Sequence, residues 1–342
     1  MLQSERPKAA QRAANVAIVG ATGAVGVELI GCLERRGFPT ASLRLLASER
    51  SAGRRIGGHV VEAVSMDAFA GVDVAFFSAG AGVSRAYAPL AAAQGALVVD
   101  NSSAFRMDPN VALVVPEVNA ADLPAGPGIV ANPNCVTAVS VMALGPLRAL
   151  GGIVRVIGAT YQSASGAGAA AMDELTASTA AQLAGEAFAP KVLPHPYAFN
   201  LFSHNAAVDP ETGYNGEEEK VMAEHRKILG LPDLRISFTC VRVPVLRAHS
   251  MALSVEFDRP VSPSAAREIL AEAPGVRLVD DRAANHFPMP VEASGEDDVL
   301  VGRIRQDLSD PEGKTLALFL SGDQLLRGAA LNAVLIAERL WR

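Results

Sequence analysis

A strand, a glycine-rich loop and a helix follow one another near the N-terminus, and this succession constrains the fold more than any other feature of the 342 residues. Asn15–Gly20 (NVAIVG) is a β-branched run that ends in glycine, and Gly23–Gly37 carries apolar residues at helical spacing up to a glycine stop. The loop and its flanks consist of Gly20, Ala21, Thr22, Gly23, Ala24, Val25 and Gly26. Glycines there permit a tight turn and close approach of a diphosphate, which the free amides of the helix start can hold. The succession predicts a dinucleotide site.

Apolar runs of strand length alternate with helical patterns as far as residue 134. A helix is expected at Val83–Gln94, and strands are expected at Leu43–Ala47, Val72–Phe77, Ala96–Val99, Val111–Val115 and Ile129–Ala131. Buried strands interleaved with helices are typical of a doubly wound parallel sheet. Residues 15–134 are therefore predicted to form an α/β, Rossmann-type cofactor-binding domain, preceded by a disordered tail over residues 1–14.

The pattern changes from about residue 153, where the strands become longer and fewer helices separate them. The expected strands are Ile153–Tyr161, Arg235–Val245, Ser250–Phe257, Val299–Gln306 and Thr315–Ser321. Residues 135–322 are therefore predicted to form an α+β domain with a large mixed or antiparallel sheet. The last segment, 323–342, has alanine and leucine at helical spacing, and we expect it to pack back on the first domain and complete it.

Charge and cysteine content exclude several classes of protein. The net charge is −6 with acidic and basic residues mixed throughout, which argues against binding to nucleic acid or to an anionic membrane. No segment has roughly eighteen uninterrupted apolar residues or the pattern of a signal peptide. The three cysteines lie far apart and suit neither a disulfide framework nor a metal cluster. We expect a soluble, cytoplasmic protein without a metal ion.

The end of the second strand indicates which dinucleotide is bound. An NAD enzyme usually has a carboxylate there, which holds the ribose hydroxyls. This chain has Arg50 flanked by Ser48 and Ser51, a combination that suits the 2′-phosphate of NADP. Glu49 would repel that phosphate and admit NAD if its side chain pointed inward. The sequence favours NADP.

Cys135 is the candidate nucleophile. It follows Asn132-Pro133-Asn134 and opens a predicted helix that ends near Leu150, and amide dipoles at a helix start lower the pKa of a thiol. We therefore expect a reactive thiolate. Cys32, on the helix after the glycine loop, and Cys240, inside a strand, are interpreted as buried structural cysteines.

Several motifs together resemble the aspartate-semialdehyde dehydrogenase family, from Val16 to about Glu338. The motifs are GATGAVG at Gly20, SERSAG at Ser48, FFSAG at Phe76, DNSSAFRMD at Asp100, PEVN at Pro116, NPNC at Asn132, YQSASGAG at Tyr161, CVRVPVLRAHS at Cys240 and RGAALNAVLIAE at Arg327. The resemblance implies a homodimer or homotetramer, with a Rossmann domain and a catalytic and dimerisation domain. The segment 191–214, to which we assign no chemistry, then belongs to a subunit interface.

The resemblance also implies a reaction and its catalytic groups. It is the reversible, NADPH-dependent reduction of aspartyl phosphate to aspartate semialdehyde and inorganic phosphate, in the biosynthesis of lysine, threonine, methionine and isoleucine. Cys135 carries the thioester, Gln162 orients the substrate and His249 is the acid/base. A thiolate suits this role because it displaces phosphate, forms a thioester that accepts hydride, and then leaves.

The remaining site residues carry over as groups that hold the substrate and the cofactor. Arg242 would bind the α-carboxylate and Glu217 the α-amino group, and Arg106, Asn134 and Lys220 would bind the phosphate. Cofactor contacts beyond the glycine loop are expected from Ser78, Ala79, Gly80, Ser165 and Gly166. The tail helix is expected to add polar groups near the nicotinamide.

Two alternatives remain open. An N-acetylglutamyl-phosphate reductase shares the cofactor loop and the cysteine, but its substrate has no free amino group for Glu217 to hold. A non-catalytic NADP-binding paralogue is the other, and the joint presence of Cys135, Gln162 and His249 argues against it. The histidines to which we assign no chemistry are His59, His195, His204, His225 and His286.

Overall fold

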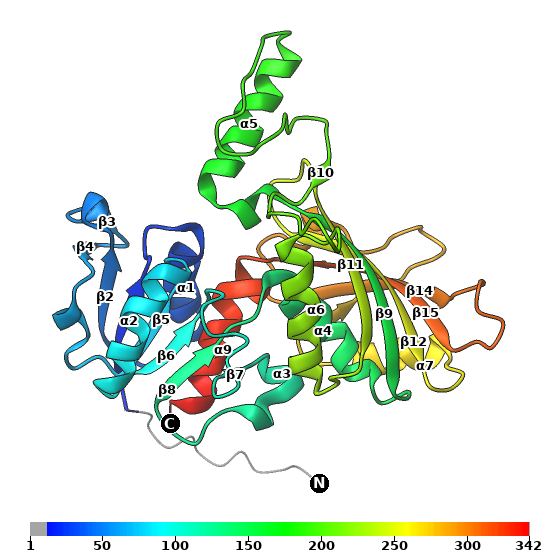
Figure 1. Ribbon diagram of the computed structural model, residues 1–342, viewed down its shortest axis with the longest axis horizontal. Coiled ribbons are helices and arrows are strands. Elements are labelled where there is room, and N and C mark those ends of the chain that lie inside the picture. The colour runs from blue at the N-terminus through cyan, green and yellow to red at the C-terminus, as the bar shows by residue number, and fades with distance from the viewer. Residues whose placement is uncertain (1–11, 342) are drawn as a thin grey trace.

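Two β-sheets with helices packed against them make up the protein, in a computed structural model that describes residues 12–341 (Figure 1). Most of the tail expected over residues 1–14 lies outside the described residues. The first strand begins at Ala14, within the range expected for the tail, because the Ala14 N–H pairs with the carbonyl of Pro39 at 2.6 Å.

The first sheet belongs to the N-terminal half. Its strands run in the order β3 (Arg55–Ile56), β4 (His59–Ala63), β2 (Thr40–Ala47), β1 (Ala14–Val19), β5 (Val74–Phe77), β6 (Leu97–Asp100), β8 (Gly128–Ala131) and β7 (Ala112–Leu113). Neighbouring strands are parallel, apart from the β3–β4 pair. Val16 and Ile18 pack on the side of α1 (Ala24–Arg36) and α9 (Leu331–Leu340), and Ala17 packs on the side of α2 (Ala81–Ala93). Both faces are thus buried, as a doubly wound sheet requires.

The second sheet is mixed. Its order is β10 (Phe202–Ser203), β11 (Arg235–Arg242), β9 (Ile153–Gln162), β12 (His249–Phe257), β15 (Thr315–Gly322), β14 (Val299–Gln306) and β13 (Val276–Leu278). The β11–β9 and β13–β14 pairs are parallel and the other pairs are antiparallel. The predicted fold class, a Rossmann-type sheet followed by a large mixed sheet, is confirmed.

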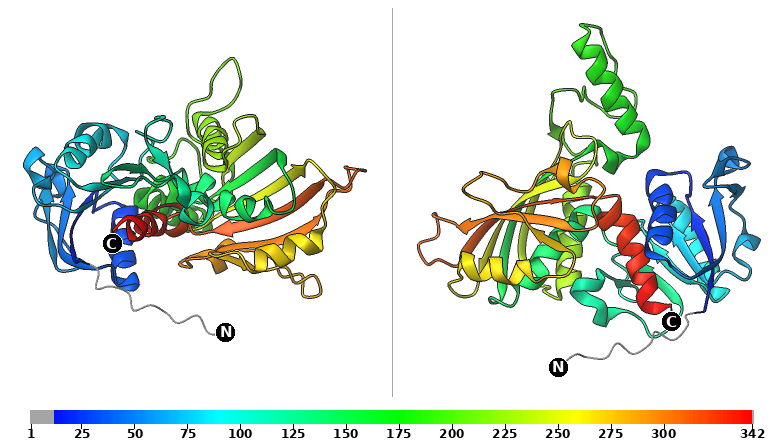
Figure 2. Two further views of the ribbon diagram at one scale, coloured as in Figure 1. Left: turned by 90° about the horizontal axis from the view of Figure 1, so that it is seen from below. Right: turned by 180° about the vertical axis from the view of Figure 1, so that it is seen from behind.

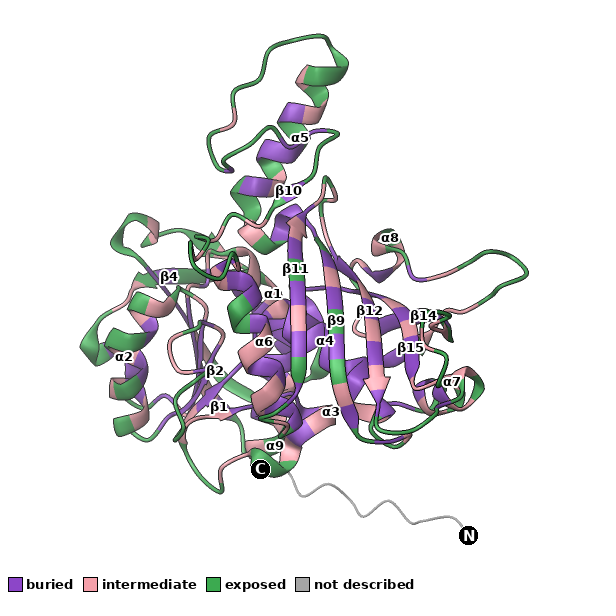
Figure 3. Cartoon of the chain, turned by 45° about the vertical axis from the view of Figure 1, so that its right-hand side comes forward, coloured by how far each residue is buried: buried purple, intermediate pink, exposed green. Residues whose placement is uncertain are grey.

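Three helices among the described residues pack against one face of the second sheet, and Figure 2 shows the ribbons from two further sides. They are α4 (Cys135–Leu147), α6 (Gly216–Leu229) and α7 (Pro263–Ala271), and they share one hydrophobic cluster with buried side chains of the strands. On the other face exposed residues alternate with buried ones along β9, where Ile157 is 43% exposed and Tyr161 is 38% exposed (Figure 3). The short helix α8 (Pro290–Ala293) covers one part of that face, where Ala293 packs with Leu300 of β14, and the side chains of β9 remain partly open to solvent.

An arm formed by residues 169–201 projects from the second sheet (Figure 1). It consists of α5 (Ala169–Leu183) and a return segment, and Glu174 holds the return by accepting the N–H groups of Lys191, Val192 and Leu193 at 2.5–2.9 Å. The remaining short helices are α3 (Pro116–Asn119) and α8 (Pro290–Ala293). Among the described residues, no helix combines the length and the apolar character that crossing a membrane requires.

Three predicted elements are shorter than expected. β11 ends at Arg242 and not at Val245, because Pro244 has no N–H to continue the ladder. β7 includes only two of the five residues expected at 111–115. The tail is not one helix over 323–342, since a π-helical turn at Leu326–Ala330 precedes α9.

Candidate active site

Cys135 is the first residue of α4, where the chain passes from β8 into the second half. Asn134 caps the helix, because its Oδ1 accepts the N–H of Val136 at 2.8 Å. Most side chains of α4 are buried, since the helix runs through the core cluster of the second sheet. The rigid helix therefore fixes the thiol at the rim of that core.

A cavity of about 240 Å³ opens beside Cys135. Eight of its lining residues are predicted site residues: Val25, Ser78, Gly80, Arg106, Asn134, Cys135, Ser165 and Gly166. The lining residues that were not predicted are Asn101, Ser102, Pro133, Gln324, Leu325, Gly328 and Ala329. The cavity thus brings parts of the expected cofactor site against the expected nucleophile.

Glu217 and Gln162 lie next to the wall of this cavity. Glu217 Oε1 accepts a hydrogen bond from Asn134 Nδ2 at 2.8 Å and another from Gln162 Nε2 at 3.3 Å. Burial alone would raise the pKa of the Glu217 carboxyl, but His204, Asn134 and Lys220 outweigh burial and lower it. A charged carboxylate beside the nucleophile can hold a substrate ammonium group.

Arg242 and His249 stand at the ends of β11 and β12 and meet at Ser163. The Ser163 carbonyl accepts from Arg242 Nη1 at 3.2 Å, and the Ser163 N–H donates to His249 Nδ1 at 3.0 Å. A Cβ on Gly166 would lie 2.8 Å from His249 Cε1 and 2.9 Å from Arg242 Nη1. Because Gly166 lines the cavity, both groups converge on its wall.

The protonation state of His249 follows from these contacts. The ring is fully buried, and burial together with Arg242 and His204 lowers its pKa well below the usual value, so the ring is neutral. Its Nδ1 accepts from Ser163, which leaves the proton on Nε2. Nε2 is buried without a hydrogen-bond partner among the described residues, so it is free to exchange a proton with a bound ligand.

The surroundings of Cys135 do not favour the expected reactive thiolate. Burial, and after it the charge of Glu217, raise the pKa of the Cys135 thiol to about 12, while Arg242 and Arg106 oppose the change. The expectation of a lowered pKa was wrong, because desolvation of the charged sulfur outweighs the dipoles of the helix start.

The expected phosphate-binding residues are only partly assembled. Arg106 is buried, donating from Nε to the Asn132 carbonyl at 2.9 Å and from Nη1 to Glu224 Oε1 at 3.1 Å. Glu224 Oε2 also accepts the Asn134 N–H at 2.6 Å. Lys220 is exposed and does not line the cavity. Sequence reasoning missed Glu224, although it lies seven residues, or two helical turns, after Glu217 on α6.

Two glycines of the loop are required by close backbone packing. Gly20 has a φ of 89°, and a Cβ there would lie 2.5 Å from the Ser78 carbonyl oxygen. A Cβ on Gly26 would lie 2.3 Å from the Gly20 carbonyl oxygen, whereas one on Gly23 would meet that oxygen only at 3.4 Å. The loop therefore forms a close-packed turn that presents backbone toward its ligand, as a dinucleotide site needs.

Other expected cofactor residues occupy two further places. Ser78, Ala79 and Gly80 follow β5 beside the glycine loop. Ser48 and Arg50 are exposed in the short turn that follows β2, and Ser51 is half-buried there. Within residues 12–341 the Arg50 side chain forms no hydrogen bond or ion pair. Across residues 12–341, no group of His, Cys, Asp and Glu side chains is arranged to hold a metal ion.

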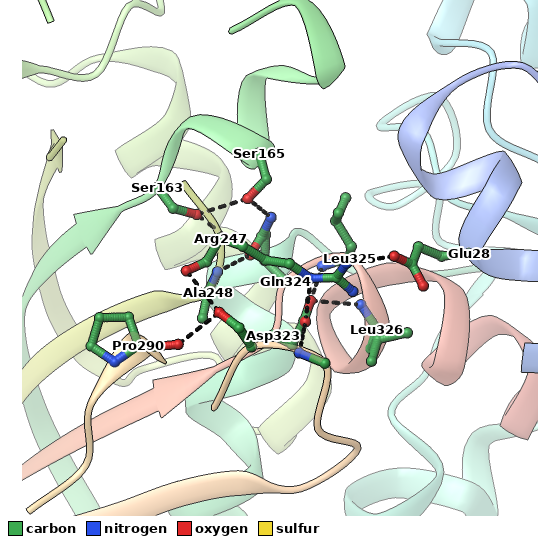
Figure 4. A network of polar contacts seen from close by, with 12 residues as sticks. Glu28, Ser163, Ser165, Arg247, Ala248, Pro290, Asp323, Gln324, Leu325 and Leu326 are labelled. Atoms are coloured by element: carbon green, nitrogen blue, oxygen red, sulfur yellow. Dashed lines mark hydrogen bonds and ion pairs between the residues drawn. The ribbon is translucent and has the colours of Figure 1, made fainter. Parts of the chain in front are cut away.

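His204 and Gln324 are two further residues of the site that were not predicted from the sequence. His204 Nε2 accepts from Arg242 Nη2 at 2.9 Å, although we had assigned no chemistry to this histidine. Gln324 Oε1 accepts the Ala248 N–H at 3.0 Å, and its Nε2 donates to Ser165 Oγ (Figure 4). No spacing in the sequence links these distant residues, although polar groups of the tail were expected near the site.

Two family models match the chain. The NAD binding domain of semialdehyde dehydrogenases matches residues 15–125, and their dimerisation domain matches residues 144–327. An aspartate-semialdehyde dehydrogenase of Synechocystis is 52% identical over 329 residues, which are 95% of this chain and 96% of that relative. This chain belongs to the aspartate-semialdehyde dehydrogenase family. The resemblance inferred from the motifs is confirmed.

Further relatives support the same family. An aspartate-semialdehyde dehydrogenase of Bacillus subtilis is 46% identical over 341 residues, which are 96% of this chain and 98% of that relative. A crystal structure of aspartate-semialdehyde dehydrogenase II from Vibrio cholerae, described as complexed with ASA, has a TM-score of 0.91 at 40% identity and covers 96% of this chain and 98% of that one. As a member of this family, the chain is an oxidoreductase with a nicotinamide-cofactor domain.

Proposed function

We propose that the chain reduces L-aspartyl-4-phosphate to L-aspartate-4-semialdehyde with NADPH, reversibly, through a thioester on Cys135. In this role it supplies the biosynthesis of lysine, threonine, methionine and isoleucine. The observation that carries the proposal is the set of groups around one thiol: Cys135 lines the cavity, with a carboxylate at Glu217 and a guanidinium at Arg242 close to its wall. The carboxylate can bind an ammonium group and the guanidinium can bind a carboxylate, so the two together suit an α-amino acid as substrate.

The chemistry begins at Cys135. Its sulfur bonds to the substrate carbonyl carbon and the bond from that carbon to the phosphate oxygen breaks, which leaves a thioester and inorganic phosphate. When bound at the glycine loop, the reduced nicotinamide would supply the hydride that the thioester carbon accepts. The resulting hemithioacetal collapses to the aldehyde, and the sulfur leaves with the bonding electron pair.

Protons must move at two places in this sequence. His249 is neutral with its proton on Nε2, so it can donate to the substrate oxygen as hydride adds and recover the proton as the aldehyde forms. The thiol has to lose its proton to water before it attacks, and its raised pKa makes this costly. Binding of the substrate ammonium at Glu217 would cancel the charge that raises this pKa, so the thiolate forms more readily once substrate is bound.

The substrate is held by charges of both signs. Arg242 is anchored by Ser163 and His204, which leaves further N–H groups on its Nη atoms for a carboxylate. Arg106 and Asn134 line the cavity and would contact the phosphate. Lys220 is exposed, and its charge acts on Glu217, so it would add positive charge near the phosphate.

The preference for NADP rests on Arg50. Its guanidinium is exposed and unpaired within the described residues, in the turn where Ser48 and Ser51 add hydroxyl groups. Replacing Arg50 with alanine should lower kcat/KM for NADP by about 10-fold or more, since a charge-assisted contact is worth about 1.5–3 kcal/mol. The value for NAD should change little. Equal losses with both cofactors would contradict this role.

We also propose that the protein is a homodimer or homotetramer that assembles through the open face of its second sheet and through the arm. Apolar side chains are exposed in both places, including Tyr161 at 38%, Phe199 at 64% and Leu201 at 62%. Exposed apolar surface of this kind commonly marks an interface. Sedimentation velocity tests it, and a monomer at micromolar concentration would contradict it.

The reaction is tested by following NADPH formation from aspartate semialdehyde, NADP and phosphate. The expected result is phosphate-dependent reduction that falls by more than about 10³-fold in Cys135→Ser. A folded protein that binds NADPH and shows no such activity would remove the aspartate assignment. Activity with N-acetylglutamate semialdehyde in its place would favour the related reductase.

A further inference from the structure

Arg247 lies in the loop between β11 and β12 and bridges the two halves of the molecule. Its Nη1 forms an ion pair with Glu28 Oε1 on α1 at 2.6 Å, and its Nε donates to Asp323 Oδ2 at 2.6 Å (Figure 4). Glu28 belongs to the helix that follows the glycine loop, and Asp323 belongs to the segment that follows β15. One guanidinium thus links the cofactor helix to the catalytic sheet.

The Asp323 end of this bridge is rigid. Asp323 is fully buried, and its Oδ1 accepts the N–H groups of Leu325 and Leu326 at 2.9 and 3.2 Å. Its Oδ2 accepts the Gly295 N–H at 2.7 Å in addition to Arg247. A buried carboxylate with this many donors holds its position strongly. Arg247 is therefore anchored at Asp323, and its other arm reaches toward α1.

The bridge lies two residues from His249. Ala248, the residue between them, has a φ of 71°, a left-handed conformation that an alanine adopts only where its surroundings impose it. Its N–H is held by Gln324 Oε1 at 3.0 Å. Two contacts thus hold the backbone just before His249: the side chain of Arg247 is anchored at Asp323, and the N–H of Ala248 is bound by Gln324.

The Glu28 end lies close to the expected nicotinamide position. Val25 lines the cavity beside Cys135, and Glu28 is three residues further along α1, one helical turn away. The glycine loop at the start of α1 is close-packed, so any shift of the loop moves the helix with it. A dinucleotide bound at the loop would therefore restrict the position of Glu28.

We propose that Arg247 is a positioning residue that couples occupancy of the cofactor loop to the placement of His249. A bound dinucleotide holds α1 in place, and with it the existing ion pair between Glu28 and Arg247 Nη1. Through the strained Ala248, Arg247 then sets the position of His249 Nε2 relative to the substrate oxygen. The inference deepens the proposed function and rests on it for the role of His249. The coupling itself is a property of cofactor binding and does not require turnover.

The test compares Glu28→Gln with Glu338→Gln. Both changes remove the carboxylate of an arginine–carboxylate pair that involves α1. Glu28 on α1 pairs with Arg247, and Glu338 on α9 accepts from Arg36 on α1 at 2.6 and 2.8 Å. The Arg36–Glu338 pair joins α1 to α9 and does not reach the β11–β12 loop. Glu338→Gln is therefore the matched control. Arg247→Lys adds a variant that keeps the charge and loses the planar, two-armed contact.

The primary measurement is amide hydrogen exchange of residues 246–250 with and without saturating NADPH, alongside the Kd for NADPH. Wild type and Glu338→Gln should show slower exchange when NADPH is bound, whereas Glu28→Gln and Arg247→Lys should lose most of this protection while still binding NADPH. Absence of protection in wild type, or equal protection in Glu28→Gln, would overturn the proposal.

The second measurement is the pH dependence of kcat. Because the coupling places a proton-transfer group, Glu28→Gln should lower kcat by about tenfold and alter its pH profile, with KM for aspartate semialdehyde little changed. A protein that is inactive with aspartate semialdehyde would refute the proposed function, and the exchange experiment would still decide the coupling.

Discussion

In the N-terminal half the glycine loop presents backbone to its expected ligand, whereas in the C-terminal half buried charged side chains surround the thiol. Gly20 and Gly26 lie so close to other backbone atoms that a Cβ has no room. Around Cys135, by contrast, the groups that matter are Glu217, Glu224 and Arg242, and all three are buried. The cofactor site should thus be sensitive to added volume, and the substrate site to the loss or gain of a charge.

The largest effect should come from adding one methyl group to the loop. Gly26→Ala places a Cβ 2.3 Å from the Gly20 carbonyl oxygen, so the backbone must shift. We expect a loss of about 2 kcal/mol of stability, a fall in Tm of roughly 5 °C, together with loss of NADPH binding. Thermal unfolding and a fluorescence titration with NADPH measure the two effects.

Gly23→Ala is the control for that prediction. Gly23 has a φ of −80° and its Cβ would lie 3.4 Å from the Gly20 carbonyl oxygen, so the fold should tolerate it. Tm should stay within a degree or two, roughly, while NADPH binds more weakly because the methyl group crowds the diphosphate. Equal changes in Tm for the two variants would show that close packing of the loop is not the reason why glycine is required at position 26.

The next effect, on one kinetic constant and not on the fold or on cofactor binding, is expected from a change of charge near the phosphate site. In Glu224→Gln an amide NH₂ faces either Arg106 Nη1 or the Asn134 N–H, so one of the two contacts is lost. Removing one such contact costs about 1.5–3 kcal/mol, which should raise KM for phosphate about 10- to 100-fold, with KM for NADP unchanged. Glu219→Gln removes the same charge from an exposed position on α6 and should leave both constants unaltered.

The smallest predicted effect concerns the reactivity of the thiol. The charge of Glu217 raises the pKa of Cys135, so Glu217→Gln should lower that pKa and enlarge the thiolate fraction at any pH below about 12. Alkylation of Cys135 by iodoacetamide at pH 8 should then be faster by roughly 2- to 5-fold in the variant. An unchanged or slower alkylation would mean that Glu217 does not act on the sulfur through its charge.

Features that depend on neighbouring residues in the chain were predictable from the sequence. The strand, loop and helix at residues 14–36 and the placement of Cys135 at a helix start follow from local patterns, and both are found. Contacts across long separations were not predictable. Glu224 and Arg106 are 118 positions apart in the sequence, and Gln324 and Ser165 are 159 apart. No periodicity in the sequence predicts that such pairs form hydrogen bonds.

The pKa of Cys135 was mispredicted for a related reason. A helix start is visible in the sequence, but the burial of the sulfur and the proximity of Glu217 appear only once α4 and α6 are packed together. The same holds for His249, whose tautomer is set by the Ser163 N–H. Residue types at the site could thus be assigned from motifs, whereas their charge states depend on tertiary packing.

The thioester on Cys135 is tested most directly by mass spectrometry of the protein mixed with aspartate semialdehyde and NADP without phosphate. We predict an aspartyl adduct on the peptide that contains Cys135, which disappears when phosphate is added and is absent from Cys135→Ser. An adduct on Cys32 or Cys240, or one that phosphate does not discharge, would contradict the assignment of Cys135 as the nucleophile.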